Sequence, residues 1–124
     1  MTLKTKMNTE VKEKWISALR SGKYKQGIRS LRTEHGYCCL GVLCDLYSQE
    51  HNKEWRFQDV WSFYNSIFFL PPDVEQWAGL NSSNPSVKIP VDDENKYFYH
   101  EPLSDLNDSG YSFEQISKLI EQQL

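Results

Sequence analysis

One set of residues in this sequence could perform nucleophilic catalysis. Cys39 is expected near the start of a helix, where the helix dipole lowers the pKa of a thiol. His35 lies close to it in the sequence, and Asn107 or Asp108 could orient a histidine, as a cysteine hydrolase requires. A free cysteine in an apolar helix is, however, more often a small core residue. We therefore favour a core role for Cys39 and assign no catalytic residue.

The same region offers four potential metal ligands, but their spacing does not match a familiar structural zinc site. Cys38 and Cys39 are adjacent, Cys44 follows after a gap of four residues, and His35 precedes them. We therefore expect neither a metal nor a cofactor. Neighbouring cysteines rarely form a stable disulfide with each other, and three is an odd number, so we expect a reduced, cytoplasmic protein.

A third set of side chains could bind an anion. Residues 1–32 carry nine Lys/Arg and two Glu, a net charge of +7, whereas residues 33–124 carry five bases and 15 acids, a net charge of −10. Arginine binds phosphate oxygens through paired hydrogen bonds, and aromatic rings can stack on a base or ribose. The candidate ligand-binding residues are Arg20, Lys23, Tyr24, Lys25, Arg29, Arg32, Tyr37, Trp77, Asn107 and Asp108.

The charge pattern has other interpretations. The basic residues could form a solvated face, which composition alone favours, or the two oppositely charged parts could neutralise each other within one domain or across a homo-oligomer. Residues 107–110 read equally as a turn between two helices. The overall net charge of −3 argues against general nucleic-acid binding.

Composition limits what kind of scaffold can position these residues. The chain has 124 residues, of which 39% are hydrophobic, 14% aromatic and 25% charged, which suits one globular domain over residues 1–124 and excludes intrinsic disorder. No apolar run approaches the length of a secretory signal or a bilayer span, so we expect no membrane partner.

Hydrophobic spacing and turn signals predict the elements. The helix ends are indicated by Asn8 or Thr9 as the first cap, by Pro72 and Gly79 around a short helix, and by a Ser112–Gln115 capping box before the last helix. We expect an α+β single small domain with about four helices, two main ones near the chain ends and a buried central one, and one or two short β-hairpins. Gly41 interrupts the central helix, which indicates close approach of another backbone. The expected helices cover residues 9–21, 38–47, 72–77, 102–107 and 113–124, and the expected hairpins pair 28–31 with 37–39 and 87–89 with 96–99. Residues 48–69 favour short strands or an irregular loop.

Several stretches together resemble a family of small uncharacterised phage and prophage proteins. They are WISALRSGKY (15–24), YCCLGVLCDL (37–46), LPPDVEQWAGL (70–80), Asn84-Pro85 and LSDLNDSGYSFEQISKLIE (103–121). The resemblance covers most of the chain but not residues 52–69. It implies a viral accessory protein that acts in the cytoplasm of a bacterial host, and it implies no reaction.

These observations lead to three hypotheses. The first is a non-enzymatic anti-defence protein that sequesters a small phosphorylated, nucleotide-derived signal; proteins of this type are often oligomers with sites at subunit contacts. The second is a protein–protein inhibitor of a host defence enzyme, for which Trp55, Trp61, Phe63 and Tyr64 would be the anchors if they are exposed; the sequence leaves open whether residues 55–69 are core or interface. The third is a cysteine hydrolase that uses Cys39.

Overall fold

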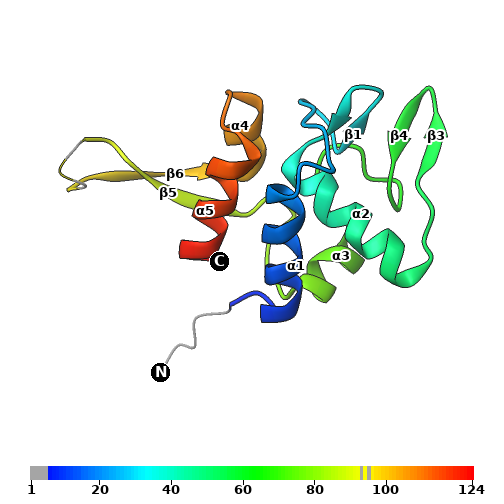
Figure 1. Cartoon of the computed structure of the whole chain (residues 1–124), viewed down its shortest axis with the longest axis horizontal. Helices are drawn as coiled ribbons and strands as arrows, with labels where there is room; N and C mark the ends of the chain where they lie inside the picture. Colours follow the sequence, from blue (N-terminus) through cyan, green and yellow to red (C-terminus); the bar gives the residue numbers. More distant parts are fainter. Residues whose placement is uncertain (1–5, 93, 95) are drawn as a thin grey trace.

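Five helices and three two-stranded sheets make up the chain in the computed structural model, which describes residues 6–92, 94 and 96–124 (Figure 1). This confirms the α+β class. The five helices lie at the five expected ranges, although about four were expected overall, and there are three hairpins where one or two were expected. The helices are α1 (Thr9–Arg20), α2 (Cys39–His51), α3 (Pro72–Ala78), α4 (Leu103–Asp108) and α5 (Phe113–Gln123). The antiparallel hairpins pair β1 (Arg32–Thr33) with β2 (Gly36–Tyr37), β3 (Arg56–Gln58) with β4 (Val60–Ser62), and β5 (Ser86–Pro90) with β6 (Phe98–Pro102).

Local sequence signals account for most helix ends. The side chain of Asn8 caps α1 by accepting a hydrogen bond from the N–H of Val11 at 3.0 Å. Pro72 opens α3, and Gly79 ends it in the left-handed conformation with φ of 72°. Ser112 and Gln115 form the predicted capping box at the start of α5.

A single hydrophobic core lies where α1, α2, α4 and α5 meet. Trp15 of α1 is fully buried, and its indole N–H donates to the carbonyl of Cys39 at 2.9 Å. Leu40, Leu43 and Cys44 are fully buried in α2, as expected for the central helix. The first turn of α2 is therefore anchored to α1 by both packing and a buried hydrogen bond.

The hairpin predicted for residues 28–31 and 37–39 is displaced in the structure. Arg29 takes a positive φ of 74°, which turns the chain, and the paired strands are β1 and β2. Tyr37 also exchanges backbone hydrogen bonds with Lys25 and Gly27, at 2.8 and 2.7 Å. The 25–27 segment thus occupies the side of β2 that the sequence assigned to residues 28–31.

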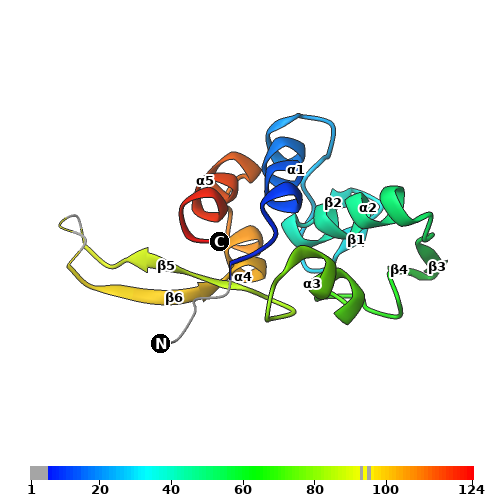
Figure 2. The same cartoon turned by 90° about the horizontal axis from the view of Figure 1, so that it is seen from below.

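Two hairpins lie at opposite ends of the elongated molecule. Figures 1 and 2 show β5–β6 projecting as an arm beside α5, while β3–β4 lies beyond the far end of α2. The 86–102 hairpin was predicted at 87–99, and β3–β4 falls in the segment for which short strands were expected. Within the described residues, no helix has both the length and the apolarity needed to cross a bilayer.

Gly41 provides a test of the core. A Cβ built at this position lies 1.7 Å from the carbonyl oxygen of Leu31, so the backbone of one segment would have to move. We expect Gly41→Ala to lower the free energy of unfolding by more than about 3 kcal/mol, measured by urea denaturation. Gly22→Ala is the control: its Cβ has open space, and its positive φ alone should cost about 1–2 kcal/mol. Equal losses in both variants would contradict this account.

Candidate functional site

The structure places the predicted basic residues in different surroundings. The Nε of Arg20 donates to Ser117 at 2.9 Å and its Nη2 lies 3.3 Å from Glu121, so this side chain ties α1 to α5. The guanidinium of Arg32 lies 3.8 Å from the ring centroid of Trp61. Arg29 and Lys23 line two separate hollows, and Lys25 is exposed in the loop before β1.

Among the predicted aromatic residues, Tyr24 and Tyr37 lie together, but they contact other residues of the protein instead of an open site. The hydroxyl of Tyr24 donates to Asp45 at 2.6 Å, and burial together with that carboxylate raises the pKa of Tyr24. The Tyr37 ring meets Tyr24 edge-on at 5.2 Å. Trp77 packs against Tyr47, with ring centroids 5.3 Å apart. These contacts stabilise the fold around α2.

Asn107 is a buried connector between three segments. Its Oδ1 accepts from the N–H of Cys39 at 3.1 Å and from Nε2 of Gln26 at 2.9 Å, and its Nδ2 donates to the carbonyl of Gly27 at 2.8 Å. Asp108 accepts from the backbone N–H of Arg29 at 2.9 Å. These contacts account for Asn107 within the fold itself.

The structure does not assemble the residues of the hydrolase hypothesis. Cys39 begins α2 as predicted, but it has no exposed surface, and burial raises the pKa of its thiol well above the ordinary value. The expectation of a lowered pKa is therefore wrong, because desolvation outweighs the helix dipole. His35 lies in the exposed β1–β2 turn beside Glu34. In the described part of the chain, no three His, Cys, Asp or Glu side chains gather as metal ligands.

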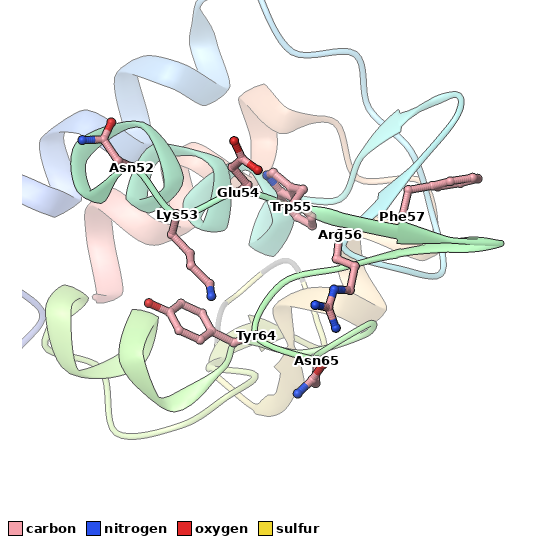
Figure 3. A pocket seen from close by; sticks show the side chains of 8 residues that line it. All are labelled: Asn52, Lys53, Glu54, Trp55, Arg56, Phe57, Tyr64 and Asn65. Carbon is pink, nitrogen blue, oxygen red and sulfur yellow. The ribbon is translucent and has the colours of Figure 1, made fainter.

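A hollow of about 760 Å³ opens between the end of α2 and the turn after β4 (Figure 3). Asn52 ends α2 in the left-handed conformation, and the N–H groups of Asn52 and Lys53 both donate to the carbonyl of Ser48. The chain then leaves the helix axis and enters β3. The lining residues are Asn52, Lys53, Glu54, Trp55, Arg56, Phe57, Tyr64 and Asn65, and we call this site the 53–65 hollow.

The opposite wall of the hollow is a strained two-residue turn. Tyr64 and Asn65 both have positive φ, at 49° and 65°, and Phe63 and Ser66 exchange two backbone hydrogen bonds of 2.9 Å across the turn. Asn tolerates this conformation, whereas a bulky residue such as tyrosine adopts it at a cost. The buried ring of Phe63 holds the turn against the core, so Tyr64 is presented to the hollow.

Two cations enter the hollow from the same wall. Figure 3 shows the side chains of Lys53 and Arg56 extending across it toward the Tyr64–Asn65 turn, while the Glu54 carboxylate points to the other side. The Nζ of Lys53 lies 4.4 Å from the ring centroid of Tyr64, within the range of a cation–π interaction. Lys53 and Arg56 therefore offer an anion two positive charges with the Tyr64 ring beside them, whereas the side-chain amides of Asn52 and Asn65 point away from the two cations (Figure 3).

A family model matches a range of residues that includes both the 53–65 hollow and the β5–β6 hairpin. The profile described as a domain of unknown function, DUF8296, matches residues 7–124. The chain belongs to the DUF8296 family. The match includes all five helices and all three hairpins of the described structure. No curated protein and no solved structure matches the chain.

Sequence reasoning missed the cations of this DUF8296 site. Lys53 and Arg56 lie in the segment without a recognised motif. The anion site was predicted instead from the concentration of basic residues at 20–32. The available signal was the alternation of charged and aromatic residues in Lys53-Glu54-Trp55-Arg56-Phe57. Only the turn at Tyr64, 11 positions later in the chain, makes that alternation one wall of a hollow.

The inhibitor hypothesis required four aromatic side chains to be exposed, and the structure exposes none of them fully. Phe63 is fully buried, and Trp55, Trp61 and Tyr64 are only partly exposed. The packing of Arg32 against Trp61 and of Trp55 against Phe63 covers these rings. The exposed large apolar side chains of this part of the molecule are instead Ile28, Phe57, Val60, Phe68 and Phe69.

Asn107 allows a test of its structural role. Asn107→Ala leaves the buried N–H of Cys39 and the carbonyl of Gly27 without their partner, so we expect a loss of about 3 kcal/mol in the free energy of unfolding. Asp108→Ala removes an exposed hydrogen bond from the N–H of Arg29 and a longer one, 3.3 Å, from Nδ2 of Asn107, which keeps its bond to the carbonyl of Gly27, so it should cost less than about 1.5 kcal/mol. Urea denaturation measures both, and an undiminished stability of Asn107→Ala would contradict the connector role.

The thiols give a second test. All three cysteines are buried, and burial raises the pKa of Cys38 to about 11. At pH 8 the native protein should therefore react with a disulfide reagent only as fast as it opens, and all three thiols should react rapidly in urea. Val60→Cys adds an exposed thiol as a positive control. Rapid modification of one native cysteine in the folded protein would show that a thiol is accessible.

Proposed function

We propose that this DUF8296 protein is a non-enzymatic accessory protein of phage origin that binds a small phosphorylated, nucleotide-derived ligand in the 53–65 hollow. In this role it sequesters an immune signal in the cytoplasm of a bacterial host. The phage origin is supported by the resemblance of the motifs at 15–24, 37–46, 70–80 and 103–121. No step of this role needs a nucleophile, which suits the burial of Cys39.

The observation that carries the proposal is that Lys53 and Arg56 extend into one hollow from the same wall. Arginine can bind two phosphate oxygens through its planar fork, and lysine adds a compact charge beside them. The volume of about 760 Å³ lies within the range of small-molecule sites. The ring of Tyr64 is then placed to contact a base or ribose.

The binding proposal predicts the effect of removing both cations. A panel of cyclic dinucleotides and ADP-ribose should contain a ligand that stabilises the wild-type protein by about 2.7 kcal/mol at 100 times its dissociation constant, detected by thermal shift. Lys53→Ala/Arg56→Ala should weaken that ligand by at least about 100-fold in calorimetric titration, because two charge-assisted interactions are lost.

Lys23→Ala/Lys25→Ala is the matched control, since it removes two exposed cations outside the hollow. This control should bind like the wild type. If it abolishes binding and the Lys53/Arg56 variant does not, the ligand occupies the basic loop and the proposed site is wrong. If no member of the panel binds, the ligand class is wrong.

The second candidate function is inhibition of a host protein. Phe57, Val60, Phe68 and Phe69 are exposed, and large apolar side chains on a surface are typical of docking sites. Phe68→Ser/Phe69→Ser should remove an inhibitory interaction and spare nucleotide binding, because neither residue lines the 53–65 hollow. The Lys53/Arg56 variant should have the reverse effect.

A further inference from the structure

The β5–β6 arm exposes a concentration of apolar side chains away from the 53–65 hollow. Val91, Tyr97, Phe98 and Tyr99 are exposed to 63%, 61%, 52% and 46%. Figures 1 and 2 show that the arm extends beyond the helices rather than lying across them. An exposed, apolar, projecting strand is a template for pairing with another chain unless its edge is blocked.

The two edge strands of the arm differ in whether their outward backbone groups already have hydrogen-bond partners. On the outer edge of β5, the side-chain amide of Gln123 imitates a neighbouring strand: its Oε1 accepts from the N–H of Lys88 at 2.7 Å, and its Nε2 donates to the carbonyl of Lys88 at 3.0 Å. Pro90 further along the same strand has no N–H to offer. The β5 edge is therefore closed by α5.

The register identifies the groups on the outer edge of β6. Because the N–H and carbonyl of Lys88 point toward Gln123, the pair Lys88–His100 is a non-hydrogen-bonded pair of the ladder. The pair Pro90–Phe98, two positions along, is of the same kind. The backbone groups of Phe98 and His100 therefore point away from β5. In Figure 2, β6 lies on the side of the arm away from α5.

We propose that β6 is a homodimerisation edge, on which β6 of a second copy of this chain pairs antiparallel about a two-fold axis at Tyr99. Phe98 of each copy then faces His100 of the other, and these two pairs supply four backbone hydrogen bonds. The two hairpins become one four-stranded sheet. This inference does not depend on the ligand proposed for the 53–65 hollow.

The backbone favours this register over its neighbours. A shift of two residues one way brings Lys96 opposite His100, but the N–H of Lys96 already donates to Asp92 at 3.1 Å. A shift the other way brings Phe98 opposite Pro102, which has no N–H. With the two-fold axis at Tyr99, every interchain hydrogen bond joins an unused N–H and an unused carbonyl of Phe98 and His100. It also places the two Tyr99 rings opposite each other at a non-hydrogen-bonded position, where side chains are closest.

The side chains at this register are compatible between identical copies. Glu101 faces Tyr97 of the second copy, so no like charges oppose each other across the two-fold axis. Lys96 of the second copy falls opposite Pro102, on the other face of the sheet from Glu101, because neighbouring side chains of a strand point to opposite faces.

Charge inversion at the two-fold axis tests the proposal. Native mass spectrometry and sedimentation equilibrium should find wild-type dimers at micromolar concentrations. Tyr99→Lys and Tyr99→Glu should each be monomeric, because like charges meet at the axis, and an equimolar mixture should recover a heterodimer. Circular dichroism checks that both variants fold. A monomeric wild type, or a mixture that stays monomeric, would overturn the proposal.

A matched pair at His100 separates strand pairing from simple apolar contact. His100→Pro removes an outward N–H that the arm itself does not use, whereas His100→Thr keeps it. Dimers should persist in the Thr variant and weaken at least tenfold in the Pro variant. Equal dimerisation of both would show that the β6 backbone does not form the interface.

Disulfide trapping tests the register. Tyr99→Cys places two thiols opposite each other at the axis and should form an interchain disulfide rapidly under mild oxidation. Val60→Cys, exposed on the β3–β4 hairpin, is the collision control, and the three native thiols are buried. Equally slow cross-linking of both variants would rule out pairing through Tyr99. Capture of a different protein's strand by β6, with no self-association, would also overturn the proposal.

Discussion

The hydrogen bonds of the buried Asn107 amide are the interaction on which the arrangement of this fold depends. One side chain bonds the backbone of residue 27, the first turn of α2 and the side chain of Gln26. Gln26 in turn accepts from the N–H of Phe113 and donates to the carbonyl of Tyr111, so the start of α5 is held by the same network. Buried polar groups are costly unless satisfied, and here each satisfies another.

This network fixes the position from which the 53–65 hollow is built. The first turn of α2 is held by Asn107 and by the indole of Trp15, and Leu31 packs its carbonyl against Gly41. Because the start of α2 is held in this way, the position of its other end, at Asn52, is also defined. The Tyr64 turn reaches the same place because Phe63 is packed in the core beside Tyr47 and Trp55. Tertiary packing therefore holds both walls of the hollow in place, although the segments that form the walls contain little regular secondary structure.

The sequence was informative wherever a residue type has one local use. The structure confirms the helix ends predicted from Pro72, Gly79 and the Ser112–Gln115 pair, and of the two candidate caps Asn8 and Thr9 it shows Asn8. Gly41 predicted a close backbone approach without identifying Leu31 as the neighbour.

The candidate site was far less predictable from the sequence than the helix ends. The basic residues at 20–32 are close in sequence, yet Arg20 reaches α5 and Arg32 reaches Trp61, because side-chain partners depend on tertiary packing. Lys53 and Tyr64 meet only through a turn with positive φ, which no sequence pattern here signals.

The placement of the hollow and the arm at opposite ends of the molecule has a consequence for how two joined chains would take up ligand. Copies held together arm to arm would carry their hollows at the extremities of a rod, each built entirely from its own chain. No wall would be shared and no helix would run from one hollow to the other. Occupancy of one end would leave the other unaffected, so saturation would follow a simple hyperbola with a Hill coefficient of about one.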